Sequence, residues 1–305
     1  MRQLRRIVRR RLDRLAARLG YVRKPDTDPT VPVDYSFLPI GPLEALQRSA
    51  GRDVIVSVPL GMLRGLNPVG FTFGLGSRHP YVETARQWRS GRCVDYVDST
   101  LYAYYRDVRP RDGADLLGID GLEEPTTLTS YTPAATDYPW VSAPGGGVME
   151  MRRRSLRRDA AEHGMSGERP LPWPTVGPMP MAGGHFGFAR VCRVTDSIAR
   201  YGYEPEVLGA GHVNATLLHA NDDAVVLVDS GDHRVAALAA LGVESVPVLL
   251  TPRHLVSRAG VSAWPGVREG AVTIEQALTV FDRVMAGRLP RCVPTVWWPA
   301  VVERV

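Results

Sequence analysis

The stretch VVLVDSGDHRVAALAALGVESVPV, residues Val225–Val248, determines the fold expected for this chain. Its first apolar residues predict a buried strand, and the Ala- and Leu-rich run predicts a short helix followed by a second strand. The turn between them reads Asp229-Ser230-Gly231-Asp232-His233-Arg234. Backbone N–H groups and the positive end of a helix favour an anion at such a turn, and His and Arg side chains add donors. The stretch therefore predicts a phosphate site, with an ordinary capped strand–turn–helix as the alternative.

The residues on both sides extend this pattern. Val213–Ala220 and Ala224–Val228 are apolar runs joined by Asn-Asp-Asp, which predicts a hairpin. A helix from Phe186 to Arg200 is expected to end at Gly202. The next strand is predicted at Val246–Leu250, and its proline indicates a sheet edge or the start of the strand. The last predicted helix is Ile274–Met285.

This half of the chain resembles the ParB/sulfiredoxin superfamily over roughly residues 185–252. The hallmark of that superfamily is a strand followed by G-x-[HR]-R-x-x-A, a short helix ending in Gly, and a strand that opens V-P-V. This chain has Gly231–Ala237, then Leu241-Gly242, then Val246–Val248. The superfamily also carries an upstream S-I-x-x-x-G-[YLF]-x-P helix, which Ser197–Pro205 matches.

The resemblance implies a small α/β (α+β) domain, a mixed sheet with helices, that binds nucleotide phosphates. Members include CTP-hydrolysing partition proteins, ATP-using sulfiredoxins and kinases that phosphorylate free serine. Sulfiredoxins have a cysteine where this chain has Asp232. Partition proteins have GERR followed by a DNA-reading domain, so specific DNA binding is not expected here. The DSGDHR form is most similar to the kinase-like and uncharacterised members.

A kinase-like activity on a small hydroxylated acceptor assigns roles to the matching residues, with ATP or CTP as nucleotide and Mg²⁺ carried by it. Asp232 would hold magnesium, act as a base or cap the helix, and Glu206 is a further candidate base. The nucleotide- and phosphate-binding candidates are Ser230, Gly231, His233, Arg234, Ser197 and Tyr203. The catalytic candidates are Asp232, His233, Asp229 and Glu204.

Composition restricts the chemistry further. Lys24 is the single lysine among the 37 basic residues, so phosphate chemistry has to rest on Arg, His, backbone and metal. The three cysteines lie far apart, and no GxSxG, HExxH, CxxC or GxxxxGK[ST] motif occurs. A metal site made by protein ligands alone is not expected. The Gly74–Pro80 turn, GLGSRHP, is a weaker candidate phosphate loop and is more typical of a plain turn.

The basic charge is concentrated at the N-terminus. The chain carries +5 overall, but residues 1–20 hold eight arginines and one acid, or +7, which leaves −2 for the rest. Arg2–Leu19 reads as a basic amphipathic helix that could bind an anionic membrane surface, a protein partner or RNA, or pack on its own domain. The apolar runs are too short for a membrane span or signal peptide, so we expect a cytoplasmic protein, which the basic helix could hold at the inner membrane face.

We therefore predict five segments. They are a basic helix (1–22), a linker (23–42), an N-terminal mixed accessory region (43–110), an irregular connector with a basic helix (111–180), and the nucleotide-binding domain with a C-terminal extension (181–305). The arginines of the connector helix, Glu150–His163, are expected in solvent, with phosphate contact as the alternative. The layout, with HPYVETARQW and ALTVFDRVMAG, also resembles uncharacterised proteins associated with cell-surface polysaccharide synthesis.

Three functions follow. The first is a nucleotide-dependent phosphotransferase, the second a non-catalytic nucleotide-binding regulator or scaffold at the membrane, and the third an RNA binder through the N-terminal helix.

Overall fold

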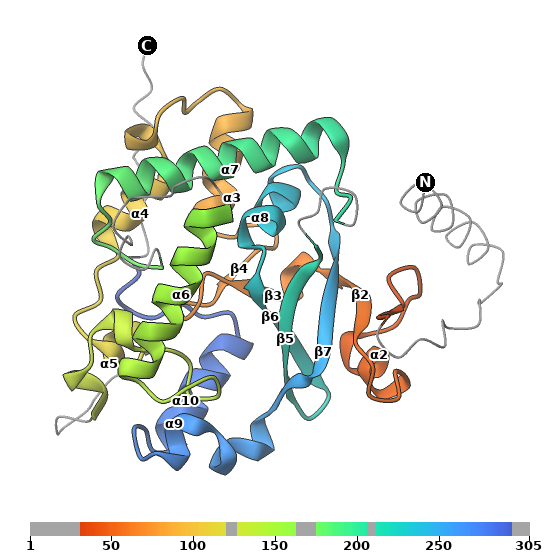
Figure 1. The fold of residues 1–305 in the computed structure, drawn as a ribbon, viewed down its shortest axis with the longest axis vertical. Coiled ribbons are helices and arrows are strands. Elements are labelled where there is room, and N and C mark those ends of the chain that lie inside the picture. The colour runs from red at the N-terminus through yellow and green to blue at the C-terminus, as the bar shows by residue number, and fades with distance from the viewer. Residues whose placement is uncertain (1–30, 120–126, 163–174, 206–210, 295–305) are drawn as a thin grey trace.

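A seven-stranded sheet is the centre of the fold in a computed structural model that describes residues 31–119, 127–162, 175–205 and 211–294 (Figure 1). The strand order is β1-β2-β7-β5-β6-β3-β4, with parallel and antiparallel pairs mixed. The predicted α/β class with a mixed sheet is thus confirmed. The strands are β1 (Val33–Asp34), β2 (Val54–Pro59), β3 (Leu63–Gly65), β4 (Phe71–Thr72), β5 (Val213–Ala220), β6 (Asp223–Ser230) and β7 (Ser245–Ser257).

The helices surround this sheet. The α-helices are α2 (Pro42–Arg48), α3 (Pro80–Arg89), α4 (Thr100–Asp107), α5 (Gly113–Leu117), α6 (Gly146–Glu162), α7 (Met181–Tyr201), α8 (Asp232–Ala240), α9 (Pro265–Arg268) and α10 (Ile274–Met285). Short 3₁₀ helices occupy Leu60–Met62, Tyr96–Asp98, Thr127–Ser130, Pro133–Ala135 and Arg258–Ala263. In the part of the chain that the structure describes, no helix has the length and apolarity that crossing a membrane requires.

Local sequence explains where several elements begin and turn. Pro80 opens α3 at a position where a missing N–H costs nothing, and His79 caps it. Thr273 and Gln276 cap α10 reciprocally, and this helix has the predicted bounds. The predicted hairpin is confirmed as β5 and β6, with Asn221 in the left-handed conformation at the turn (φ 52°).

The strand β7 differs from its prediction in place and length. It lies between β2 and β5, so it is not an edge strand, but the alternative that Pro247 stands near the start of the strand agrees with a strand that begins at Ser245. Proline is tolerated there because pairing with β5 starts only at Val248, which leaves Pro247 beside β2 alone. The strand continues beyond Leu250 to Ser257 through an irregularity, in which Ala215 pairs with Leu250 but Leu217 pairs with Leu255.

Apolar side chains alternate between the two faces of the hairpin and fill two cores. Val226 and Val228 face a core that includes residues of α3, α7 and α8. Leu218 and Leu227 face a second core, whose other members include Tyr138, Trp140, Trp264 and Phe281. Strand side chains alternate between the two faces, and Val225 and Leu227 face the second core. The next residue on that face is Asp229, at the end of β6.

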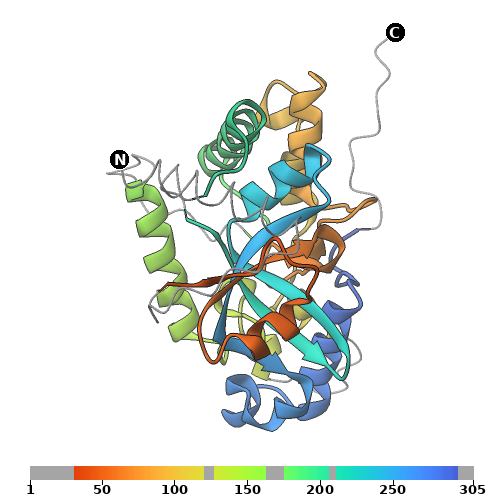
Figure 2. The same ribbon diagram turned by 90° about the vertical axis from the view of Figure 1, so that its right-hand side faces the viewer.

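The helices gather at opposite ends of the sheet, as Figure 1 shows. The helices α3, α7 and α8 pack together at one end, and α9 and α10 lie at the other. Figure 2, turned by 90°, shows α6 standing to one side of the strands. This arrangement leaves α6 to cover the part of the second face that α10 does not reach.

One sheet joins two of the predicted segments. The strands β2, β3 and β4 come from the region predicted as an accessory (43–110), and they flank β5, β6 and β7 from the predicted nucleotide-binding domain (181–305). The backbone hydrogen bonds of β2 to β7 and of β3 to β6 therefore make these two segments parts of one structural unit.

Candidate functional site

The predicted strand–turn–helix around residue 231 is present in the structure. Strand β6 ends at Ser230 and α8 begins at Asp232, with Gly231 between them at φ 108°. The Gly231 carbonyl accepts the N–H groups of Arg234 (2.8 Å) and Val235 (3.0 Å), which closes the first helical turn. A side chain at 231 would be strained at this φ and would lie 2.9 Å from the Arg234 guanidinium, so the turn requires glycine.

The Arg234 side chain binds the protein's own backbone. Its guanidinium donates to the Gly211 carbonyl and, at 3.4 Å, to the His212 carbonyl. It also interacts with the hydroxyl of Tyr203, and burial lowers the arginine pKa. These hydrogen bonds connect α8 to the segment just before β5. The prediction for Arg234 was contact with phosphate.

The His233 side chain points toward α3. Its ring stacks on the ring of Tyr81, with centroids 4.4 Å apart and an interplanar angle of 23°. Helices α3 and α8 are in contact there, so the ring contributes to the packing of the two helices. His233 and Arg234, two of the predicted phosphate donors, therefore point in different directions from the first turn of α8.

Asp232 connects α8 to the end of β3. Its Oδ1 accepts the backbone N–H of Leu66 at 2.7 Å and lies 3.9 Å from Nε2 of His79. The carboxyl is 19% exposed, and burial raises its pKa to about 6 although the hydrogen bond from Leu66 opposes the shift. Asp232 does not cap α8, because Gly231 is the N-cap and that cap has no side-chain hydrogen bond; the carboxylate instead accepts a backbone N–H from another element.

His79 is a fully buried histidine beside Asp232. Its Nδ1 accepts the backbone N–H of Tyr81 at 3.2 Å, and its ring stacks on Phe73 with centroids 4.3 Å apart. Burial lowers its pKa to about 3, so the ring is neutral near pH 7. Because Nδ1 is an acceptor, the proton of the neutral ring is on Nε2, the atom nearest Asp232.

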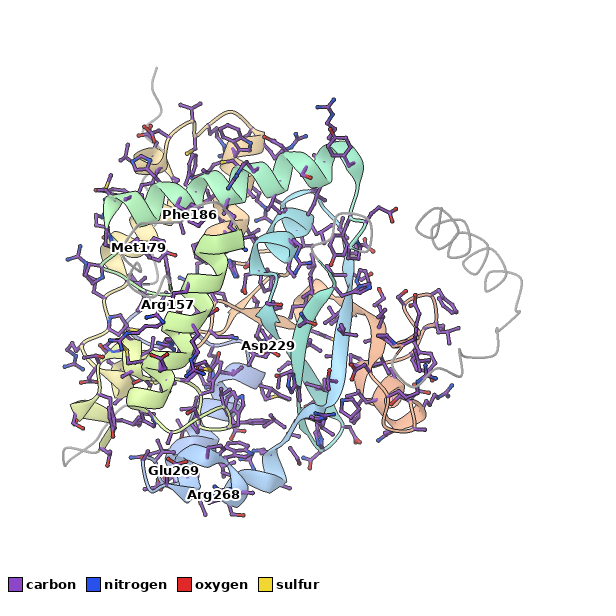
Figure 3. All side chains as sticks on the ribbon, in the orientation of Figure 1. Arg157, Met179, Phe186, Asp229, Arg268 and Glu269 are labelled. Atoms are coloured by element: carbon purple, nitrogen blue, oxygen red, sulfur yellow. The ribbon has the colours of Figure 1, made fainter. Side chains whose placement is uncertain are left out.

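Asp229 lies on the opposite face of the sheet from Asp232. Its Oδ2 accepts a hydrogen bond from Thr216 Oγ1 at 2.9 Å and is 3.8 Å from Nδ1 of His254. Its pKa is raised to about 7, mainly by burial, with smaller contributions from Asp232 and Asp137, while the Thr216 hydrogen bond opposes the shift. Figure 3 shows Asp229 between the strands and α6. A carboxylate with this pKa can accept or donate a proton near neutral pH.

A cavity of about 790 Å³ lies in front of Asp229, and we call it the sheet cavity. Strands β5, β6 and β7 form its floor, while α6 and residues 137–141 form its opposite wall. Its lining consists of Asn67, Asp137, Tyr138, Trp140, Val141, Met151, Arg152, Arg154, Ser155, Thr216, Leu227, Asp229, Arg253, His254 and Val256.

Arginines outnumber carboxylates in this lining. Arg152 is 4% exposed, and it donates to the carbonyls of Pro133 (3.1 Å), Ala134 (2.7 Å) and Thr136 (2.5 Å). It also lies 3.8 Å from a carboxylate oxygen of Asp137, whose pKa is raised by burial in spite of this arginine. The prediction that the arginines of this helix lie in solvent is therefore wrong for Arg152, because the loop before α6 folds back over it.

The other two arginines of the sheet cavity are exposed. Arg154 pairs with Glu150 one helical turn away (3.1 Å), and exposed pairs of this kind contribute little energy. Arg253 is exposed next to His254, in the β7 segment that bulges where Ala215 pairs with Leu250 and Leu217 with Leu255. Bulges re-aim side chains beside functional sites, and this one directs an arginine and a histidine to the sheet cavity.

The remaining predicted residues lie elsewhere. Ser230 accepts a hydrogen bond from Asn214 Nδ2 at 3.0 Å, Ser197 is half-buried on α7, and Glu204 is exposed after that helix. Glu206 falls outside the described residues. Of the candidates predicted from the motif that the structure describes, Asp229 alone lines the sheet cavity.

Sequence reasoning missed most of this cavity. The residues not predicted are Asp137, Thr216, Arg253 and His254, whereas Arg152 and Arg154 belong to the connector helix, for which phosphate contact was the alternative. Thr216 could have been predicted from the hairpin. It pairs with Leu227, and Leu227 and Asp229 lie two residues apart on β6, so all three side chains lie on one face of the sheet. No local pattern indicated Asp137, which comes from an irregular segment. In the described residues no group of three or more His, Cys, Asp or Glu side chains could hold a metal ion.

Comparison of the chain with models of protein families, with curated proteins and with solved structures gave no match. The resemblance to the ParB/sulfiredoxin superfamily therefore stays a prediction, and the function has to be argued from the cavity itself.

Proposed function

We propose that this protein is a phosphotransferase that moves the terminal phosphoryl group of a nucleoside triphosphate, ATP or CTP, to a small hydroxylated acceptor. The observation that supports this most is Asp229, a carboxyl with a pKa of about 7 in a cavity that also presents exposed arginines. Positive side chains and one proton acceptor are the groups that phosphoryl transfer asks of a protein.

The two exposed arginines would bind the phosphates. Arg154 and Arg253 have guanidinium groups at the sheet cavity, and arginine binds phosphate oxygens in a bidentate manner. Arg152 is already committed to three carbonyls, so its contribution would be long-range charge. Magnesium would arrive with the nucleotide and neutralise part of the phosphate charge, and Asp229 and Asp137 are the carboxylates that line the cavity.

Asp229 would act on the acceptor. As the acceptor oxygen attacks the terminal phosphorus, its proton passes to the Asp229 carboxylate, and the bond to the bridging oxygen of the diphosphate breaks. The products are a phosphate monoester, the nucleoside diphosphate and a protonated Asp229, which returns its proton to solvent. Thr216 would hold the carboxylate in place through its 2.9 Å hydrogen bond.

In this proposal the Gly231–Arg234 turn supports the site and does not bind the nucleotide. Gly231, His233 and Arg234 place α8 against β5 and α3, and that packing fixes the end of β6 where Asp229 lies. The resemblance to kinase-like members of the ParB/sulfiredoxin superfamily agrees with the reaction class, while the phosphates would lie on the other face of the sheet.

The test combines binding with turnover. The full chain is titrated with ATP, CTP, ADP and GTP in magnesium by calorimetry, and multiple-turnover release of diphosphate is followed with pools of hydroxylated acceptors. We expect Arg253→Ala to weaken nucleotide binding at least tenfold. The matched control Arg268→Ala, an exposed arginine at the end of α9 (Figure 3), should leave it unchanged.

Two results would contradict the proposal. Nucleotide binding without turnover on any acceptor would favour the regulator or scaffold. If Arg234→Ala abolished nucleotide binding and Arg253→Ala did not, the phosphates would bind at the Gly231–Arg234 turn and not in the sheet cavity. Attachment of Arg2–Leu19 to a membrane, a protein partner or RNA is a separate prediction, because those residues lie outside the described part of the chain.

A further inference from the structure

A second cavity, of about 800 Å³, lies between the turn after β4 and the segment after α10, and we call it the arginine cavity. Its lining consists of Phe71, Thr72, Gly76, Ser77, Arg78, Gly287, Arg288, Leu289, Pro290, Arg291, Val293 and Pro294. Three of these residues are arginines, and none is an acid. The two chain segments that meet here are far apart in sequence, so neither alone indicates an anion site.

Two further arginines are buried in the protein beside this cavity. Arg64 and Arg283 are each 6% exposed, and burial lowers the pKa of both. Arg64 donates to four carbonyls, those of Val284 (2.9 Å), Gly61 (2.8 Å), Leu63 (3.1 Å) and Met285 (2.9 Å). Arg283 does the same with Leu117 (3.0 Å), Val69 (2.7 Å), Arg288 (3.0 Å) and Pro68 (3.3 Å).

These buried cations stand directly behind the cavity wall. A Cβ added at Gly287, a lining residue, would lie 3.3 Å from Nη2 of Arg64. The Arg288 carbonyl, also from the lining, accepts the hydrogen bond from Arg283.

Carbonyl oxygens satisfy the donors of Arg64 and Arg283 but do not cancel their charge. Among the described residues neither arginine forms an ion pair with a carboxylate. The Val284 and Met285 carbonyls belong to the C-terminal end of α10, whose partial negative charge offsets part of the cost for Arg64. An arginine stays protonated even when buried, so within the described part of the chain these two positive charges have no carboxylate in contact with them.

Two carboxylates in this part of the described structure already have arginine partners. Asp282 of α10 is held by Arg258 in a two-point contact with both distances 2.8 Å. Asp115 of α5, near Cys292, accepts from the backbone and side chain of Arg111. The field of Arg64 and Arg283 therefore adds to that of Arg78, Arg288 and Arg291 at the cavity.

From this arrangement we infer that the arginine cavity is a second binding site, which takes a small molecule carrying a phosphate or diphosphate group. Arg288 and Arg291 bind its oxygens from the solvent side, and Arg64 and Arg283 stabilise its charge from behind. Leu289 offers an apolar contact for the rest of the ligand, while Phe71 and Val293, which also line the cavity, are almost fully buried. The site shares no lining residue with the sheet cavity, so it is independent of the proposed phosphoryl transfer.

The test uses inorganic pyrophosphate with the full chain, titrated by calorimetry at low ionic strength with chloride as the background anion. We expect saturable binding that weakens at least tenfold in the double variant Arg288→Ala/Arg291→Ala. Both side chains are exposed, so the variant should fold, which circular dichroism checks. Arg268→Ala, an exposed arginine away from the cavity, should bind as the wild type does.

Thermal unfolding gives a second measurement. Pyrophosphate should raise the melting temperature of the wild type and of Arg253→Ala, and should fail to do so in the double variant. The inference is overturned if pyrophosphate does not saturate, if Arg268→Ala weakens it equally, or if the loss occurs in Arg253→Ala. That last result would place pyrophosphate in the sheet cavity. A chain that binds pyrophosphate here but turns over no nucleotide would support this site and contradict the proposed function.

Discussion

Asp229 and Asp232 stand three residues apart in one turn, yet they lie on opposite faces of the sheet. Asp232 accepts a backbone N–H from Leu66 inside the core, whereas Asp229 opens onto a cavity and accepts from a side-chain hydroxyl. Burial raises the pKa of both, to about 6 and about 7. A raised pKa alone therefore does not identify a catalytic carboxyl. What separates the two is whether the carboxyl can meet a ligand.

The largest effect is expected at Asp229. Asp229→Asn keeps an oxygen that can accept the Thr216 hydrogen bond but removes the proton acceptor. We expect turnover of the phosphotransferase to fall by about 10²–10⁴-fold, the usual contribution of a general base, with nucleotide affinity within a fewfold of wild type. Steady-state kinetics and calorimetry measure the two quantities.

A control in the same hairpin tests whether this loss is specific. Asp222→Asn removes an exposed carboxylate from the β5–β6 turn and should leave turnover unchanged. If Asp229→Asn retains more than about a tenth of wild-type turnover, Asp229 is not the base, since positioned general bases contribute more than that.

Asp232 should instead affect stability. Asp232→Ala leaves the Leu66 N–H without its acceptor next to a buried histidine, at a cost of about 1–3 kcal/mol in free energy of unfolding. Urea unfolding should show a lower midpoint with an unchanged slope. Turnover per folded molecule should stay within about tenfold of wild type. A loss as large as that of Asp229→Asn would give Asp232 a catalytic role and remove the distinction between the two faces.

The same pair predicts how stability depends on pH. Each carboxyl has a pKa above its unfolded value of 3.8, so the folded protein binds more protons than the unfolded chain between pH 4 and 7. Their contribution is complete below pH 3.8 and is lost as the pH rises through about 6 and about 7. His79 acts in the opposite direction, because its pKa is lowered to about 3.

Asp232→Asn isolates the buried carboxyl, because an amide keeps the acceptor oxygen but does not ionise. Relative to wild type, this variant should gain about 1–2 kcal/mol in free energy of unfolding as the pH rises from 4.5 to 7.5. The gain is smaller than the full pKa shift of Asp232 would give, because the carboxyl is partly exposed to solvent. Urea unfolding at three pH values measures this. A difference that is constant with pH would mean that Asp232 has an ordinary pKa in the fold.

Much of the sheet could be predicted from the sequence, because its signals are local. Two apolar runs joined by an Asn-Asp-Asp turn predicted β5 and most of β6, and the last predicted helix has the bounds of α10. The end of β7 could not be predicted, because the prolines at 247 and 252 interrupt the strand pattern while backbone pairs with β2 and β5 hold the strand.

The candidate site was less predictable than the fold, because it depends on contacts between residues that are far apart in the sequence. Asp229 follows directly from the motif, but its partners are Thr216, His254 and, across the cavity, Arg152 and Asp137. These residues meet because α6 and residues 137–141 stand opposite the strands across the sheet cavity. His233 and Arg234 show the converse, since their spacing suggested a shared anion and long-range packing turned them to separate partners.

The smallest effect is expected at His254, which distinguishes a catalytic neighbour from a surface one. His254 Nδ1 is 3.8 Å from Asp229 at a half-exposed position, and exposed pairs contribute at most about 1 kcal/mol. His254→Gln should therefore lower turnover by less than about fivefold, and its pH–rate profile, compared with that of the wild type, tests whether the 3.8 Å contact affects Asp229. His185→Gln is the matched control, since His185 lies 3.6 Å from Asp95 at a similarly exposed site that does not line the sheet cavity. Equal profiles for the two variants would show that His254 does not affect the base, and a tenfold loss at His254 alone would give it a direct part in the proton transfer.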